Sequence, residues 1–191
     1  MEKVTIEGFH GTGIENIKSI LEERFIYTHR EDHWLGQGFY FYSDINLALW
    51  WIKRKKGVDD GSGCAVIRAV FECMKEQWLD LDTVPGMDYF LSEVSSILTN
   101  ESTNVSLKFR AGSFSDEIKN LCFALDLLKR VRGIKLIALT FRKDKPTYAS
   151  ESIATFKRNF FPLPKDVIYQ ERQICCSANA IISSKTVVFP N

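Results

Sequence analysis

The order of its strand-like and helix-like segments is the feature that most constrains the fold of this chain. A strand-like run at residues 4–10 precedes apolar residues at helical spacing, and a second strand-like run at residues 39–42 precedes a second helical pattern. A third strand-like run, residues 64–73, leads into a long stretch of mostly helical pattern. Three more strand candidates follow: residues 134–141, 166–176 and 180–189. Strands and helices do not alternate regularly, so the order predicts an α+β fold and not a doubly wound sheet.

Four helices are predicted between these strands. The first is indicated by apolar residues at helical spacing: Ile14, Ile17, Leu21 and Phe25. Ser43 or Asp44 can cap the second, whose C-terminal end carries the basic run 53–56, where the helix dipole favours cations. The other two are expected over residues 88–98 and, from a serine cap to a glycine, over residues 115–133.

Length and composition indicate one globular domain over residues 1–191. Apolar residues make up 45% of the chain and charged residues 26%, which is typical of a folded domain. The formal net charge of +1 gives no general attraction to nucleic acids or membranes. No apolar run is long enough to span a bilayer, and the N-terminus has no signal-peptide core, so we expect a cytoplasmic protein.

The cysteines do not indicate a metal site or a disulfide framework. They are odd in number, lie mostly in apolar stretches and lack paired metal-ligand spacing: Cys64, Cys73, Cys122, Cys175 and Cys176. We expect buried, reduced thiols.

Two glycine-containing motifs carry the functional information. The first is "FHGT", residues 9–12, at the end of the first strand, and the second is "WLGQGFYFYSD", residues 34–44, around the second strand. The "GTG" of the first motif is not the G-x-G-x-x-G of a dinucleotide-binding Rossmann turn, because no third glycine follows. A Rossmann fold is therefore excluded as an interpretation.

Taken together, these motifs and a late strand with an acidic residue resemble the ADP-ribosyltransferase fold of the poly-ADP-ribose polymerase and diphtheria-toxin type, which carries a His-Tyr-Glu signature. With "QICC" near the C-terminus, the chain is similar to small stand-alone bacterial members, several of which are toxins of toxin–antitoxin or anti-phage systems. The resemblance implies a split mixed or antiparallel sheet with flanking helices. It also implies NAD as co-substrate, no metal, and transfer of ADP-ribose with release of nicotinamide.

The resemblance assigns roles to residues of both motifs. It implies that His10 hydrogen-bonds the adenosine-side ribose and that Gly11 lets the backbone approach the nicotinamide amide. Tyr40 would stack on the nicotinamide ring, and Trp51 would close its other side. The NAD-binding set implied in this way is His10, Gly11, Thr12, Gly38, Tyr40 and Trp51.

The catalytic carboxylate has two candidate positions. Strand alternation in "VIYQERQICC" puts Glu171 and Gln173 on one face. Alignment on "QICC" places Gln173 at the glutamate position of the family, whereas the chemistry favours Glu171, because a carboxylate stabilises the positive charge that develops on the ribose. We expect Glu171 to be catalytic together with His10 and Tyr40, with Gln173 as the alternative.

The resulting hypothesis is an NAD-dependent mono-ADP-ribosyltransferase, the toxin of a bacterial system with a separate antitoxin protein. Arg30 and the basic run 53–56 favour RNA or DNA over protein as the acceptor, because they can contact phosphates. Two alternatives stay open: an NAD glycohydrolase, and a catalytically silent module that binds ADP-ribose or a partner. Each residue also has a purely structural interpretation, with His10 satisfied by backbone and Tyr40 and Trp51 as core aromatics.

Overall fold

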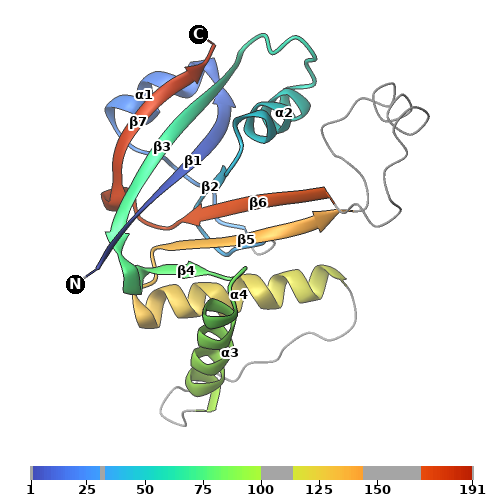
Figure 1. Ribbon diagram of the computed structural model, residues 1–191. Helices are drawn as coiled ribbons and strands as arrows, with labels where there is room; N and C mark the ends of the chain where they lie inside the picture. Colours follow the sequence, from blue (N-terminus) through green and yellow to red (C-terminus); the bar gives the residue numbers. More distant parts are fainter. Residues whose placement is uncertain (1, 31–32, 100–113, 144–168, 191) are drawn as a thin grey trace.

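A computed structural model describes residues 2–30, 33–99, 114–143 and 169–190 of the chain. It contains a seven-stranded sheet and four α-helices (Figure 1). The strands are β1 (Lys3–Gly13), β2 (Phe39–Tyr42), β3 (Cys64–Met74), β4 (Trp78–Asp80), β5 (Leu136–Lys143), β6 (Tyr169–Cys176) and β7 (Ile182–Phe189). The helices are α1 (Ile17–Glu22), α2 (Ile45–Lys56), α3 (Val84–Thr99) and α4 (Phe114–Arg132), with 3-10 turns over Ile14–Asn16, Lys75–Gln77 and Asn179–Ile181.

The sheet is mixed, and its strand order is β4-β5-β6-β2-β1-β3-β7. The pair β4–β5 is parallel, and the other neighbouring pairs are antiparallel. This arrangement confirms the predicted α+β class. Strands β1, β3 and β7 run steeply through Figure 1, whereas β4, β5 and β6 run across it, so the sheet consists of two differently oriented halves.

The two halves meet weakly between β1 and β2. Strands β1 and β3 pair along their whole length, from Lys3 opposite Met74 to Gly13 opposite Cys64. By contrast, β1 and β2 pair at one position, Phe9 opposite Tyr42. The two strands diverge beyond that pair, which leaves room for a cleft between the halves.

The core consists of two hydrophobic clusters, which share β5 and β6 because side chains alternate along these strands. One cluster packs α1 and the aromatic rings of Phe25, Phe41 and Phe71 against β1, β2, β3, β5 and β6. The other packs α3 and α4 against β4, β5 and β6, with Leu125 and Leu128 fully buried. Figure 1 shows α3 and α4 together on the β4–β5 side of the molecule. All five cysteines are buried and free, as expected from the sequence.

Helix α2 begins and ends where the sequence predicts. The Asp44 carboxylate accepts hydrogen bonds from the backbone N–H groups of Asn46 (2.6 Å) and Leu47 (3.3 Å), so Asp44 is the cap. The helix ends after the basic run at Gly57, which is in the left-handed conformation. These signals fix α2 directly after β2, beside the point where the sheet divides.

The prediction for the first helix is wrong in part. Helix α1 starts at Ile17 and ends at Glu22, and Ile14 and Leu21 are 45% and 36% exposed. Phe25 is 3% exposed but lies beyond the helix, where its ring packs against those of His10 and Phe41. This distant aromatic contact, and not helical periodicity, buries Phe25.

Two further differences concern strands. The three-residue strand β4 lies within a stretch predicted to be helical, and its pairing with β5 overrides the local pattern. Strand β6 is described from Tyr169, so the predicted start of this strand at residues 166–168 lies outside the described residues.

Candidate functional site

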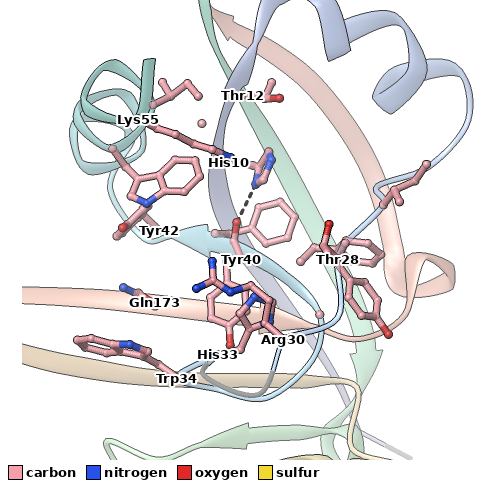
Figure 2. Close-up of a pocket in the computed structure, with 18 of the residues that line it drawn as sticks. His10, Thr12, Thr28, Arg30, His33, Trp34, Tyr40, Tyr42, Lys55 and Gln173 are labelled. Atoms are coloured by element: carbon pink, nitrogen blue, oxygen red, sulfur yellow. Dashed lines mark hydrogen bonds between the residues drawn. The ribbon is translucent and has the colours of Figure 1, made fainter. Parts of the chain in front are cut away.

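A cleft of about 880 Å³ lies at the division of the sheet. Its lining comes from β1, β2, β6, α2 and the segment that connects α1 to β2. Figure 2 shows side chains from all these parts directed toward the same space. The lining includes seven of the eight residues nominated from the sequence: His10, Gly11, Thr12, Gly38, Tyr40, Trp51 and Gln173.

His10 bridges the two strands where their backbone ladder stops. Its Nδ1–H donates to the backbone carbonyl of Tyr40 at 2.8 Å, the dashed line in Figure 2. A carbonyl only accepts hydrogen bonds, so Nδ1 carries the proton and Nε2 of the neutral ring is an acceptor. Burial lowers the pKa of His10, the bond to Tyr40 raises it, and the charge of Lys55 lowers it further. The ring is therefore neutral at pH 7 and offers Nε2 to a hydroxyl donor.

The Tyr40 hydroxyl both donates and accepts a hydrogen bond within the protein. It donates to the carbonyl of Gly36 (2.7 Å) and accepts from the backbone N–H of Leu35 (2.8 Å). Burial raises the pKa of this phenol strongly, so it does not act as a proton donor or acceptor in the neutral range. Tyr40 lines the cleft and packs edge-on to His33, with ring centroids 5.2 Å apart. Tyr40 therefore offers a ligand the surface of its aromatic ring and not its hydroxyl.

Gly11 and Thr12 hold β1 close to α2 and to the turn that follows. A side chain at Gly11 would clash with the carbonyl oxygen of Ala48 in α2 and touch Ile52. Close packing of the helix on the strand therefore explains Gly11 directly, a structural role beside the ligand-binding role expected from the sequence. Thr12 is buried and accepts a hydrogen bond from the Asn16 amide at 3.2 Å.

The segment 33–38 forms a second wall of the cleft and is held by α4. Lys129 of α4, whose side chain is 8% exposed, donates to the backbone carbonyls of Leu35 (2.8 Å) and Gln37 (2.7 Å). Asp126 accepts from the backbone N–H of Gln37 at 2.6 Å and pairs with Lys129 at 3.2 Å. These bonds satisfy buried backbone groups that no ladder reaches.

Gly38 ends this segment against β6. A Cβ there would lie 2.6 Å from both the Sγ of Cys175 and the carbonyl oxygen of Cys176. Only glycine allows this approach, so Gly38 lets β2 enter the sheet beside β6.

The opposite wall is the face of α2 that carries two tryptophans and two cations. Trp50 and Trp51 are half-buried, and Arg54 and Lys55 are exposed. The guanidinium of Arg54 lies 5.8 Å from the Trp50 ring centroid, and the ammonium of Lys55 lies 4.8 Å from that of Trp51. In Figure 2 the Lys55 side chain points toward His10, in agreement with its effect on the His10 pKa.

The two candidates for the catalytic carboxylate position differ sharply in access. Gln173 is half-buried and lines the cleft, opposite Tyr42 in the β2–β6 ladder. Glu171 is 1% exposed and is not part of the lining. It is nevertheless close to the site, because burial and then the charge of Glu171 raise the pKa of Tyr42, which does line the cleft.

The cleft is suited to an anionic ligand with flat rings. Among its described lining residues are three cations, Arg30, Arg54 and Lys55, and no aspartate or glutamate. Trp34, Trp50 and Trp51 lie in the same lining and offer stacking surfaces. A nucleotide combines these two properties.

Sequence reasoning missed the residues that hold the second wall. Lys129 and Asp126 lie on a helix far along the chain from "WLGQGFY", and their helical pattern alone gives no sign of contact with that motif. The burial of the Lys129 side chain and the contacts of both residues with the segment 33–38 are visible only in the fold. Tyr42 is a further lining residue that the sequence did not single out; the register of β2 and β6 puts it opposite Gln173, two residues from Glu171 along β6.

No protein-family model, curated protein or solved structure matches this chain. Within the residues that the structure describes, no helix has the length and apolar character needed to cross a membrane.

Proposed function

We propose that the cleft binds NAD and that the protein is an NAD-dependent mono-ADP-ribosyltransferase with an ADP-ribosyltransferase-type split sheet. One observation carries the proposal. His10 of β1, Tyr40 of β2 and Gln173 of β6, which come from three neighbouring strands, all line one cleft. This is the strand placement expected from the family resemblance, and the aromatic and cationic lining supports a dinucleotide as ligand.

A ribose, the nicotinamide and the pyrophosphate of NAD each have a complementary group in the lining. Nε2 of His10 accepts a hydrogen bond from a ribose hydroxyl, because Nδ1–H is committed to Tyr40. Tyr40 and Trp51 present rings to the nicotinamide, and Lys55 and Arg30 present charge to the pyrophosphate.

The reaction breaks the bond between the ribose C1′ and the nicotinamide nitrogen. The bond's electron pair leaves with nicotinamide, and positive charge develops on the ribose. The amide oxygen of Gln173 contacts a ribose hydroxyl, while Glu171, behind Tyr42, supplies the stabilising negative field from inside the protein.

Kinetics of two variants test these roles separately. Gln173→Ala removes a ligand contact, so it raises the KM for NAD. Glu171→Gln keeps the shape and removes the charge, so it lowers kcat by about tenfold or more with little change in KM. The measurements are nicotinamide release and transfer of labelled ADP-ribose to macromolecules of a cell extract. No release and no label with the wild-type protein would rule out the transferase.

A second candidate function is a catalytically silent module that binds NAD or ADP-ribose. The observation in its favour is the absence of a carboxylate from the described lining, with Gln173 at the cleft and Glu171 buried. It predicts tight binding of ADP-ribose, no release of nicotinamide, and affinity unaffected by Glu171→Ala. An NAD glycohydrolase would instead release nicotinamide without any acceptor.

We also propose that the protein acts as a toxin controlled by a separate antitoxin. Expression of the wild-type chain then slows bacterial growth, and His10→Gln or Glu171→Gln relieves the effect because turnover is lost. Equal toxicity of the variants, at equal protein level, would contradict a toxic activity based on NAD.

A further inference from the structure

The basic run at the end of α2 divides into two functionally different pairs. The Lys53 ammonium donates to the backbone carbonyl of Asp59 at 2.7 Å, and that of Lys56 pairs with the Glu15 carboxylate at 2.9 Å. Arg54 and Lys55 make no ion pair within the part of the chain that the structure describes, and each lies over a tryptophan ring instead. Lys53 and Lys56 therefore stabilise the fold, whereas Arg54 and Lys55 remain able to bind a ligand.

Each of these two cations lies over a tryptophan ring on the face of α2 that lines the cleft, and we call the two pairs the Trp50–Arg54 ridge and the Trp51–Lys55 ridge. Residues four apart on a helix lie one above the other, so Trp50 stacks below Arg54 and Trp51 below Lys55. Figure 2 shows the Lys55 side chain directed toward His10, so we place the Trp51–Lys55 ridge at the proposed NAD site. The Trp50–Arg54 ridge lies one residue further around the helix and also lines the cleft.

We propose that the Trp50–Arg54 ridge binds the acceptor of the reaction and that this acceptor is a single-stranded nucleic acid. A half-exposed indole with an arginine over it matches the way proteins hold unpaired bases and their phosphates. The described lining has no carboxylate to repel a phosphate backbone. The assignment rests on the proposed function, since it names the acceptor for the same cleft.

The transfer step balances with no additional reactant. The bond between C1′ and the nicotinamide nitrogen breaks, and nicotinamide leaves with the electron pair. A nitrogen or oxygen atom of the nucleic acid donates a pair to C1′ and releases its proton to solvent. The products are nicotinamide, a proton and ADP-ribosylated nucleic acid.

Binding of a fluorescent single-stranded RNA or DNA oligonucleotide, measured by anisotropy without NAD, tests the ridge. Wild-type protein is expected to bind with an affinity that falls as salt rises. Arg54→Ala reduces the slope of log K against log salt by about 0.7, the share of one phosphate contact in a single strand. Trp50→Leu, which keeps an apolar side chain, weakens binding roughly tenfold and leaves the slope unchanged.

Lys56→Ala is the matched control for Arg54→Ala. It removes the same charge two residues away, but Lys56 is paired with Glu15 and does not line the cleft. We expect it to leave both affinity and salt slope near the wild-type values. An effect of Lys56→Ala equal to that of Arg54→Ala would show that only the net charge matters and would overturn the assignment.

Separate titrations distinguish failure of this inference from failure of the proposed function. NAD binding to the wild-type protein without oligonucleotide binding up to about 100 µM, the weak end of non-specific binding, would overturn the acceptor site alone. Full displacement of the oligonucleotide by NAD, or transfer of label to protein only, would also overturn it. Oligonucleotide and NAD bound together, with label on the nucleic acid, is the expected result.

Discussion

The two walls of the cleft are built in opposite ways. In the wall formed by residues 33–38, Lys129, Asp126 and the Tyr40 hydroxyl all bind backbone groups of the segment. In the wall formed by α2, Arg54 and Lys55 touch indole rings and no described carboxylate. The first wall directs its polar groups at the protein, and the second directs them at the cleft.

The first wall therefore sets the shape of the cleft, and the second wall provides the groups that recognise a ligand. A buried, hydrogen-bonded wall fixes where the aromatic ring of Tyr40 stands, and it should respond to mutation with a loss of stability. An exposed cationic wall contributes little to stability and should respond with a loss of ligand affinity.

Lys129→Ala should destabilise the wall formed by residues 33–38. It leaves two carbonyls and the Asp126 carboxylate without their buried donor, so we expect a loss of about 3 kcal/mol in the free energy of unfolding. Chemical denaturation measures this loss. Lys56→Ala, which removes an exposed pair, is the control, with an expected change of about 0.5 kcal/mol or less. Equal losses in the two variants would contradict the contrast.

Gly38→Ala should strain the same wall at its junction with β6. The new methyl group would lie 2.6 Å from the Cys176 carbonyl oxygen, a backbone atom that cannot turn away. We expect a loss of about 2 kcal/mol in the free energy of unfolding, typical of overpacking. Gly57→Ala is a useful comparison, because nothing lies within 4 Å of its added Cβ and its cost is that of the left-handed backbone alone.

His10 lies between the walls, and its titration should appear in the pH dependence of stability. Its folded pKa is lower than the ordinary value of 6.5 found in an unfolded chain. The unfolded chain therefore binds the extra proton first, so this contribution to stability is present above pH 6.5 and is lost as the pH falls from 6.5 through the lower folded pKa. Denaturation between pH 5 and 8 should show this loss in the wild type and in the variant of the exposed His29, His29→Gln, but not in His10→Gln. An identical pH profile for His10→Gln would contradict it.

Lys55→Ala should have the smallest effect on stability and a clear effect on binding. The side chain is exposed and forms no described ion pair, so we expect a change within about 0.5 kcal/mol in the free energy of unfolding. Affinity for ADP-ribose should fall roughly tenfold, the effect of one lost charge-assisted contact. A loss of stability without a loss of affinity would contradict the prediction, because it would show that Lys55 supports the fold and does not contact the ligand.

Local signals allowed prediction of the elements around the cleft. The exact bounds of β2, a cap at Ser43 or Asp44 and the basic C-terminal end of α2 follow from residue types within a few positions of each other. The division between β1 and β2, and α2 packed on Gly11, then bring the two motifs together. The α+β class followed from the order of these elements.

Contacts between distant parts of the chain could not be predicted. Phe25 is buried by rings of β1 and β2, and Lys129 by carbonyls almost a hundred residues earlier in the chain. For the same reason, the sequence alone could not decide whether Glu171 or Gln173 reaches the cleft. Alternation puts both on one face of β6, but only the neighbouring strands and segments decide that Gln173 reaches the cleft and Glu171 is buried.

Titration of NAD into the wild-type protein and into His10→Gln, followed by calorimetry, measures whether the cleft binds NAD through His10. We expect saturable binding of one NAD per chain to the wild type. Affinity should be at least about tenfold weaker in His10→Gln, because the ribose loses its acceptor at Nε2. Absence of saturable binding to the folded wild-type protein, or equal affinity of the two proteins, would contradict it.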